Sequence, residues 1–262
     1  MMHASDSPTA ARPPATAANG IAIASGKGGV GKTWFAVTLS HALARAGRRV
    51  LLFDGDLGLA NVDIQLGLAP ETDLGAILRH GLSLERGITS FELAGFDVLA
   101  GQSGSGNLAS ITAGRLHQLC DALVALAPRY DHLIIDLGAG VERTVRQLAA
   151  RCRICVVLIT DEPTALTDAY AFVKLLAGEA PQMDFRIVVN MAHSQTEGER
   201  SYLTLLKACQ AFLKLAPPLA GTVRRDARVK ECIRQQMPLL LRHPTSPAAS
   251  DVEAIAGRLV TL

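Results

Sequence analysis

Aromatic side chains and long apolar runs are both scarce in this sequence. Aromatic residues make up only 4% of the 262 residues, with a single tryptophan. No apolar run reaches the ~18 residues that a membrane-spanning helix needs, and no charged segment followed by an apolar one marks a secretory signal. We therefore expect a cytoplasmic protein without direct membrane insertion, which a partner would have to recruit to a membrane or cell pole.

Cysteine and net charge are also low. The five cysteines are an odd number with irregular spacing, which favours reduced thiols over a disulfide framework. The formal net charge is only +2, so no specific nucleic acid is expected as a partner, although a local basic patch stays open. In contrast, 49% of the residues are hydrophobic, which is enough for a substantial core.

The chain reads as one domain behind a short tail. Residues 1–18 are mostly Ala, Pro, Ser and Thr, and such a segment is expected to be a disordered tail. In residues 19–262, short apolar runs alternate with helical stretches, without an internal repeat or a second domain boundary. The expected strands are Gly20–Ser25, Arg49–Asp54, Phe96–Ala100, His132–Asp136, Ile154–Thr160, Phe185–Asn190 and Leu219–Val223, and the clearest helices are Trp34–Ala46, Ala113–Ala127 and Thr164–Ala177.

This alternation predicts the fold class. Strands that are apolar throughout and alternate with helices are typical of a parallel sheet that is covered on both faces. We therefore expect a single-domain α/β fold with a mostly parallel, twisted sheet and helices on both faces. The last expected helix, Ser250–Leu262, has one apolar stripe that suits packing on the core. It has a single basic residue, Arg258, and no aromatic anchor, which argues against a membrane-surface helix.

A phosphate-binding loop is the strongest motif. Gly26-x4-Gly31-Lys32-Thr33 matches the G-x(4)-G-K-[ST] pattern and lies between an expected strand and an expected helix. Glycines in such a loop let backbone N–H groups turn toward phosphate oxygens, and the helix N-terminus adds its positive dipole end. We expect Lys32 to reach the β and γ phosphates and the Thr33 hydroxyl to bind Mg²⁺.

The same loop contains a second lysine, Lys27. The residues Gly26, Lys27, Gly28, Gly29, Val30, Gly31, Lys32 and Thr33 form a deviant Walker A loop, and the chain resembles the ParA/MinD family of dimerising ATPases over residues 19–262. The resemblance implies that ATP or ADP binds with Mg²⁺ and that hydrolysis is slow and dimer-dependent. It also implies that Lys27 crosses a homodimer interface to the partner's phosphates, as an arginine finger does. The alternative is an exposed loop lysine without this role.

Carboxylates end two of the expected strands, at the edge where α/β sheets bind ligands. The resemblance implies that Asp56 orients the attacking water and touches the Mg²⁺ shell, with Asp54 in support. It also implies that Asp136 holds a water on the metal and that Gly138 lies close to the γ-phosphate. Catalysis would thus rest on Lys27, Lys32 and Asp56, and metal binding on Thr33, Asp56 and Asp136. For Asp54, a turn-forming or capping role is the alternative.

Other positions of the site agree with the family less closely. The family usually has Ser or Thr where Leu137 stands, so one hydroxyl near the γ-phosphate is missing. Asn190 ends a strand where the family places an amide against the adenine edge, with a plain turn asparagine as the alternative. The next adenine-loop element contains Val223, Arg224 and Asp226 but lacks the usual proline. We expect it to form a backbone wall on the base, with arginine stacking.

Within the family, the segment Asp56–Asp63 most resembles the FlhG/FleN branch, which controls flagellar number and position. Gly138–Gly140 and Asp161–Tyr170 do so too. The resemblance implies a flagellar assembly protein or a transcriptional activator as partner. Residues 1–19 contain nothing like the motif with which this branch stimulates the GTPase FlhF. A ParA-type partition ATPase that binds DNA non-specifically, and an adaptor that does not hydrolyse nucleotide, remain as alternatives.

Three weaker signals have mainly structural interpretations. The pair Cys152-x-x-Cys155 runs into an expected strand, where side chains three residues apart point to opposite faces, so buried thiols are expected rather than a metal site. The basic stretch Arg224–Lys230 is expected to be a solvated loop and helix start near the nucleotide. Trp34 is expected to lie in the core.

Overall fold

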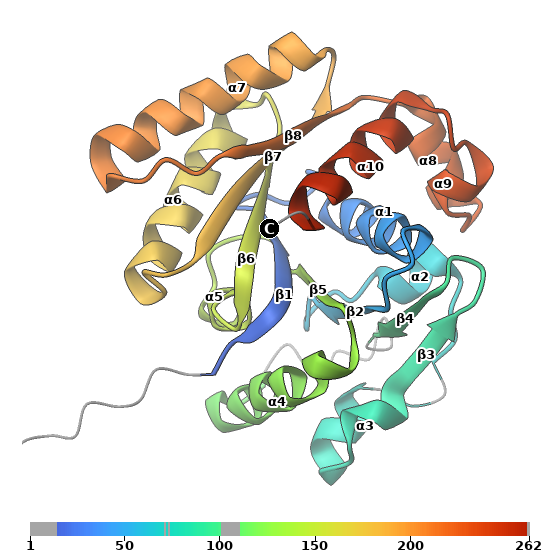
Figure 1. The fold of residues 1–262 in the computed structure, drawn as a ribbon. Coiled ribbons are helices and arrows are strands. Elements are labelled where there is room, and N and C mark those ends of the chain that lie inside the picture. The colour runs from blue at the N-terminus through green and yellow to red at the C-terminus, as the bar shows by residue number, and fades with distance from the viewer. Residues whose placement is uncertain (1–14, 71, 73, 101–110, 261–262) are drawn as a thin grey trace, which may run out of the picture.

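The computed structural model describes residues 15–70, 72, 74–100 and 111–260, and these residues form an α/β domain (Figure 1). An eight-stranded sheet has the order β3-β4-β2-β5-β1-β6-β7-β8. Its neighbouring strands pair in parallel, except for the antiparallel pair β3 and β4 at one edge. The predicted fold class, a mostly parallel sheet with helices on both faces, is confirmed.

The elements alternate along the chain as the sequence predicts. The strands are β1 (Ala17–Ala24), β2 (Val50–Gly55), β3 (Ile88–Phe91), β4 (Phe96–Leu99), β5 (His132–Leu137), β6 (Cys152–Ile159), β7 (Asp184–Ala192) and β8 (Leu219–Arg224). The helices are α1 (Lys32–Arg45), α2 (Val62–Leu66), α3 (Leu74–His80), α4 (Ala113–Leu126), α5 (Arg143–Ala149), α6 (Pro163–Glu179), α7 (Gln195–Ala208), α8 (Ala227–Arg234), α9 (Leu239–Arg242) and α10 (Pro247–Val260). Short helical turns are η1 (Leu84–Gly87), η2 (Ala127–Arg129) and η3 (Cys209–Leu213).

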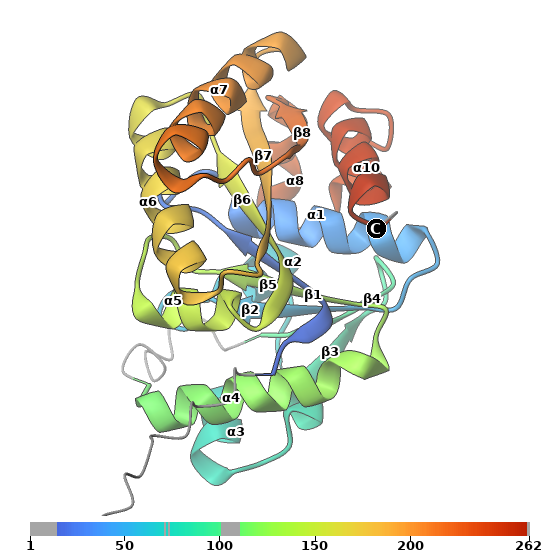
Figure 2. The same cartoon turned by 60° about the vertical axis from the view of Figure 1, so that its left-hand side comes forward.

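Alternate side chains of each strand enter two separate cores. In β1, Ile21 and Ile23 pack into the core that α1, α2 and α8 to α10 cover. Ala22 and Ala24 point the other way, into the core that α3 to α7 cover. Figure 2 shows α1 and α10 on one side of the sheet and α3 and α4 on the other. Because both faces are covered, the central strands are apolar throughout.

The two ends of the sequence differ in detail from the expectation. β1 begins at Ala17, whose N–H donates to the carbonyl of Arg151 at 2.7 Å. Ala17 and Ala18, which the composition places in the tail, therefore belong to the sheet, while residues 1–14 lie outside the described residues. α10 begins at Pro247 rather than Ser250, and its apolar stripe is buried in the core. Packing of the last helix on the core is thus confirmed as far as residue 260.

The Cys152–Cys155 pair does not follow the expected geometry. Both side chains enter the same core instead of opposite faces. The pairing of β1 with β6 shifts register beside Cys152, and this irregularity interrupts the strict alternation. Burial raises the pKa of both thiols, which suits the predicted buried, reduced cysteines.

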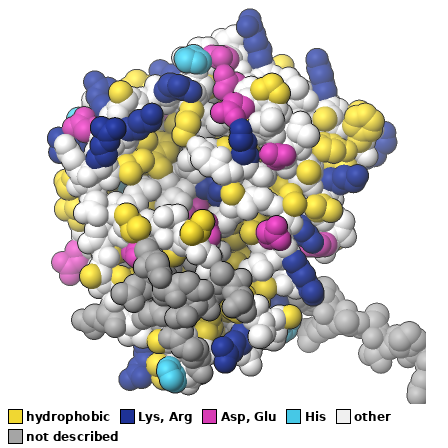
Figure 3. Space-filling model, turned by 180° about the vertical axis from the view of Figure 1, so that it is seen from behind, with side chains coloured by type: hydrophobic (Ala, Val, Ile, Leu, Met, Phe, Trp, Pro, Cys, Tyr) yellow, Lys and Arg dark blue, Asp and Glu magenta, His cyan; other side chains and the backbone are white. Residues whose placement is uncertain are grey.

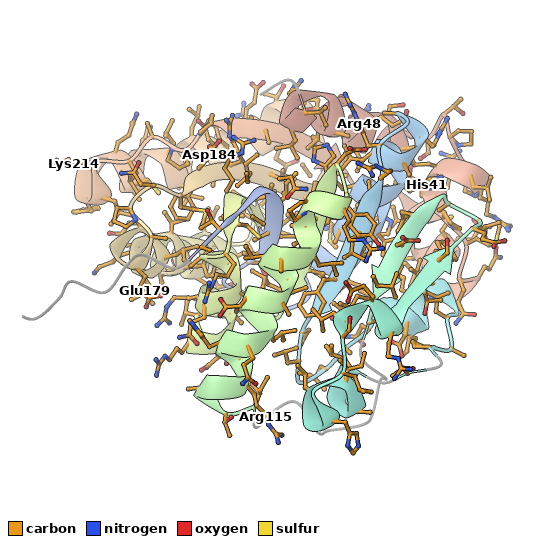
Figure 4. All side chains as sticks on the ribbon, turned by 60° about the horizontal axis from the view of Figure 1, so that its bottom comes forward. His41, Arg48, Arg115, Glu179, Asp184 and Lys214 are labelled. Atoms are coloured by element: carbon orange, nitrogen blue, oxygen red, sulfur yellow. The ribbon has the colours of Figure 1, made fainter. Side chains whose placement is uncertain are left out.

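The amino-terminal and carboxyl ends of the parallel strands lie at opposite edges of the sheet. Figure 4 turns the bottom of Figure 1 toward the viewer and labels three residues near the amino-terminal ends: Arg48 before β2, Glu179 at the end of α6 and Asp184 at the start of β7. The loops that leave β1, β2, β5, β6 and β7 lie at the opposite, carboxyl edge. Ligands of open α/β sheets bind at this carboxyl edge, which is where the predicted phosphate loop lies.

Candidate functional site

Two glycines fix the path of the loop between β1 and α1. Gly31 has a φ of 90°, a left-handed conformation, and a Cβ added there would lie 2.5 Å from Nδ2 of Asn190. A Cβ on Gly26 would lie 2.2 Å from the backbone of Asp168 in α6. Only a residue without a side chain fits at these two positions, so the Gly-rich pattern is a steric requirement of this loop.

Asn190 holds the phosphate loop through a side-chain hydrogen bond. Its Nδ2 donates to the carbonyl of Val30 at 2.8 Å, and its Oδ1 accepts from the N–H of Met191 at 3.0 Å. The side chain is buried, with an exposed fraction of 2%. Asn190 is therefore a structural contact of the loop, and its predicted contact with an adenine edge would use the remaining amide hydrogen.

Lys32 and Asp136 form the buried centre of the site. Burial lowers the pKa of Lys32, and the charges of Asp136 and Asp56 oppose that effect. Burial also raises the pKa of Asp136 to about 7, together with the charge of Asp54, while a hydrogen bond from Thr33 and the charge of Lys32 oppose the rise. Oδ1 of Asp136 has no hydrogen-bond partner among the described residues. A buried carboxylate oxygen without a hydrogen-bond partner is unfavourable, and a bound ion or water would compensate for the missing bond.

Asp54 shapes the loop that follows β2. Its Oδ2 accepts from the N–H groups of Asn61 at 2.9 Å and Val62 at 3.0 Å, and its Oδ1 accepts from the N–H of Asp56 at 3.1 Å. Burial raises the pKa of Asp54 to about 6 despite these bonds. Asp54 therefore acts on the site through the backbone of the loop that contains Asp56.

Asp56 and Gly138 face each other across the site. Oδ1 of Asp56 accepts from the N–H of Leu59 at 3.0 Å, and a Cβ added to Gly138 would lie 3.4 Å from the Asp56 carboxyl carbon. The adjacent Leu137 is 1% exposed and packs into the core. Its apolar side chain supplies no hydroxyl to the site.

Lys27 has partners that the sequence did not indicate. Its Nζ forms an ion pair with the carboxylate of Glu162 and lies 3.0 Å from Oγ1 of Thr164. Both partners lie at the N-terminal end of α6. The Lys27 side chain is 37% exposed, so the contact lies at the surface. Although the segment Asp161–Tyr170 stood out in the sequence, no spacing rule connects it to a residue 135 positions earlier.

A cleft of about 380 Å³ lies beside the loop. Four residues predicted to contact the base line it together, namely Asn190, Val223, Arg224 and Asp226. Trp34 and Met191 line it as well. Trp34 is buried, as expected, with an exposed fraction of 6%. Its place in the cleft was not predicted from the sequence, and neither was that of Met191, which has a left-handed φ of 60°.

Arg224 and Asp226 have structural contacts in this cleft. Arg224 forms a bidentate pair with Asp251 of α10, with Nε to Oδ2 and Nη2 to Oδ1 both at 2.9 Å. Asp226 caps α8 by accepting from the N–H of Arg228 at 3.0 Å. The guanidinium of Arg224 is thus engaged with α10, and its stacking on a base stays a prediction.

Known proteins resemble this chain in sequence and in fold. It is 34% identical to the antiactivator FleN of Pseudomonas aeruginosa, over 91% of this chain and 85% of that protein. It is 30% identical to the flagellum site-determining protein YlxH of Helicobacter pylori, over 92% of this chain and 81% of that protein. The solved structure of the septum site-determining protein MinD from Pyrococcus horikoshii OT3, complexed with Mg-ADP, matches 92% of this chain and 96% of its own, with a TM-score of 0.79 at 24% identity.

A family model agrees with these likenesses. Residues 21–239 match the CobQ/CobB/MinD/ParA nucleotide binding domain. The match begins within β1, before the phosphate loop, and ends at the start of α9. It therefore includes the buried carboxylates and the cleft. The chain belongs to the CobQ/CobB/MinD/ParA family of nucleotide-binding proteins.

Proposed function

We propose that this protein is an ATP-driven switch that forms a dimer around bound nucleotide and regulates flagellar number or placement. The observation that carries the proposal is a phosphate loop with one buried lysine, Lys32, and one surface lysine, Lys27. The flagellar role is supported by the likeness to FleN and to the flagellum site-determining YlxH. The expected partners are a second copy of the chain and a flagellar assembly protein or transcriptional activator.

The geometry suits a nucleoside triphosphate. α1 begins after Gly31 without a side-chain cap, so the N–H groups of its first turn are available to phosphate oxygens. Lys32 would neutralise the β and γ phosphates from its buried position. The cleft lined by Asn190 and Val223 lies beside the loop and would hold the base.

The residues around Asp136 fit a magnesium ion. Oδ1 of Asp136 lacks a hydrogen-bond partner among the described residues. The Thr33 hydroxyl forms a hydrogen bond with this carboxyl group, and the charge of Asp56 raises its pKa. Mg²⁺ prefers oxygen ligands and is usually held by one or two protein groups, with waters and phosphates in the other positions. Bound Mg²⁺ would neutralise charge on the phosphates. Thr33, Asp56 and Asp136 would hold it, and Asp56 would orient the attacking water.

Lys27 supports a dimer-dependent reaction. It lies at the surface and contacts Glu162 of its own chain, so reaching a partner's phosphates would require it to leave that contact. The adaptor alternative rests on Leu137, which supplies no hydroxyl to the site. An assay of ATP turnover distinguishes this alternative from the proposed switch.

The DNA-binding alternative receives less support from the surface. Two arginines of the basic stretch are engaged, Arg224 with Asp251 and Arg228 with Asp226. Figure 3 shows acidic side chains interspersed with basic ones over the face in view.

No helix in the described part of the chain is long and apolar enough to cross a membrane. We propose that recruitment to a membrane or cell pole takes place through a partner protein.

The proposal is tested by separating the two lysines. We expect Lys32→Ala to abolish detectable binding of a fluorescent ATP analogue in the presence of Mg²⁺. Lys27→Ala should bind the analogue normally and release phosphate at less than about a tenth of the native rate, because an arginine-finger-type group contributes 10³–10⁵ to such rates. Lys174→Ala, at an exposed position of α6, is the matched control. Native turnover by Lys27→Ala would contradict a role of this lysine across the dimer.

The flagellar role needs a test in cells. A strain whose only copy of the gene encodes Lys32→Ala should show an altered number or position of flagella by electron microscopy. The Lys174→Ala strain should keep the native pattern. An unchanged pattern in the Lys32→Ala strain would separate the nucleotide switch from flagellar control.

A further inference from the structure

Three metal-ligating side chains converge at the carboxyl ends of β6 and β7. Asp161 follows β6, His193 follows β7, and Glu197 lies in the first turn of α7. One ligand atom from each lies within 4.8 Å of the others. β6 and β7 are parallel neighbours, with Ile159 paired to Val189, so the segments that follow them emerge at the same edge. The sheet thus brings together residues that are distant in the sequence.

The backbone that presents these side chains is held firmly. Ser194 caps α7 by accepting from the N–H of Glu197 at 3.1 Å. Gln195 donates to Oδ1 of Asp251 at 3.1 Å. Gly198 packs so closely on Thr222 that an added Cβ would lie 2.3 Å from its side chain. The start of α7 is therefore fixed on β8 and α10, so the backbone that carries His193 and Glu197 is held in place without an ion.

The charges in this cluster have no other compensation. None of the three side chains has a hydrogen-bond or ion-pair partner within the described residues. The nearby Lys27 is paired with Glu162 and not with Asp161. Two carboxylates this close to each other repel. A divalent cation bound between them would attract both carboxylates and so replace the repulsion with a net attraction.

We propose that Asp161, His193 and Glu197 form a site for a divalent transition-metal ion of the Zn²⁺ class, with water in the remaining positions. An imidazole nitrogen beside two carboxylates favours Zn²⁺, Co²⁺ or Ni²⁺, whereas Mg²⁺ favours oxygen ligands alone. The site is distinct from the expected magnesium position, whose residues come from α1 and from the ends of β2 and β5. Asp161 directly precedes Glu162, the residue that pairs with Lys27. The ion would therefore link the segment between β6 and α6 to the start of α7.

Calorimetry with Zn²⁺ tests this site on the full chain. The protein, free of nucleotide and stripped of metal with a chelator, is titrated with Zn²⁺ in excess Mg²⁺, which occupies the all-oxygen positions. We expect one Zn²⁺ per chain. His193→Ala should weaken its affinity by about tenfold or more, because even the loss of an outer-shell partner costs 10–100-fold. Glu197→Gln, which keeps the shape of the side chain, should weaken it as well.

A second histidine–carboxylate pair supplies the control. His117 on α4 lies 3.3 Å from Asp121, and both are exposed, so His117→Ala removes a comparable surface pair elsewhere. This variant should bind Zn²⁺ with native affinity. Circular dichroism confirms that each variant is folded. The proposal is overturned if no stoichiometric Zn²⁺ binding occurs, or if His193→Ala and Glu197→Gln bind as the native protein does.

Discussion

At the residue scale, the two lysines of the phosphate loop lie in different environments. Lys32 is buried beside carboxylates, whereas Lys27 is 37% exposed and pairs with Glu162. An exposed ion pair contributes only about 0–1 kcal/mol to stability. The contact between Lys27 and Glu162 is therefore weak enough to exchange for another partner.

Glu162→Gln should free Lys27 from its own chain. Because this contact competes with the proposed contact across the dimer, and each of the two chains loses one, its loss should tighten ATP-dependent dimerisation by up to about thirtyfold, the equivalent of about 1 kcal/mol for each chain. Sedimentation with a non-hydrolysable ATP analogue measures the dissociation constant. Glu179→Gln, which breaks a pair with Arg146 at the other end of α6, is the control. Weaker dimerisation of Glu162→Gln would mean that Glu162 itself contacts the partner.

His41 makes stability depend on pH. It is buried on α1, its Nδ1 has no hydrogen-bond partner among the described residues, and burial together with the charge of Arg45 lowers its pKa to about 4. Between pH 4 and 6.5 the unfolded chain binds more protons at this histidine than the folded chain, so stability rises with pH across that window and is fully present above it. At 1.36 kcal/mol for each pKa unit, the change amounts to at most roughly 3 kcal/mol.

Urea unfolding at pH 4.5 and at pH 7 measures this effect. The free energy of unfolding of His41→Leu should change less between the two pH values than that of the native protein. Lys174→Ala, which removes no histidine and lies at an exposed position of α6, is the control and should leave the difference unchanged. Equal pH dependence in the native protein and His41→Leu would show that His41 is not the group responsible.

The sequence identifies site residues whose roles depend on local pattern. Lys32 follows from the loop motif, and Asp136 follows from an apolar strand that ends in a carboxylate. Glu162 and Met191 could not be identified, because their roles depend on contacts between loops that only the folded sheet brings together. The hydrogen bond from Asn190 to Val30 spans 160 residues, and no local rule predicts such a contact.

At the scale of elements, α10 illustrates how periodicity predicts burial. Its apolar stripe packs against the core, and its Asp251 bonds to Arg224 and Gln195. The helix was predictable because its apolar positions repeat at helical spacing over several turns. β3 was not predicted, because it is only four residues long and mostly half-buried or exposed. A strand of that kind lacks a continuous apolar run.

The burial of α10 predicts that the protein does not bind anionic lipid vesicles, with or without ATP. Its apolar face is occupied by the core, and its single arginine, Arg258, donates to the carbonyl of Ala220 at 2.8 Å. One basic residue offers only about 1 kcal/mol of attraction to an anionic surface. Co-sedimentation with phosphatidylglycerol vesicles measures binding. Binding that is lost on removal of residues 251–262 from a still folded protein would contradict the prediction.

At the scale of the whole molecule, the fold places both loop lysines and the carboxylates at one edge of the sheet. We predict that ATP with Mg²⁺ converts the protein from a monomer to a two-fold dimer, because the proposed target of Lys27 lies on a second chain. Light scattering on the hydrolysis-blocked Asp56→Ala variant should give about twice the 27.7 kDa of one chain. ADP should leave the mass unchanged, and so should ATP added to the Asp56→Ala, Lys27→Ala double variant.

A mass that stays at one chain with saturating ATP would contradict this prediction, provided that the analogue-binding assay shows the nucleotide to be bound. A dimer that forms equally well with ADP would contradict it too. In that case the third phosphate would not control association, and Lys27 would need another explanation.

The hairpin of β3 and β4 has a practical consequence for following this molecule in living cells. β4 runs parallel to β2, so the turn between β3 and β4 lies at the amino-terminal ends of the parallel strands, opposite the phosphate loop. Glu92 and Leu93 in this turn are exposed. Exposed loop tips accept inserted sequences best. A fluorescent reporter placed between these two residues would sit at the end of the sheet opposite the phosphate loop, and would let the protein be tracked by microscopy with its switch intact.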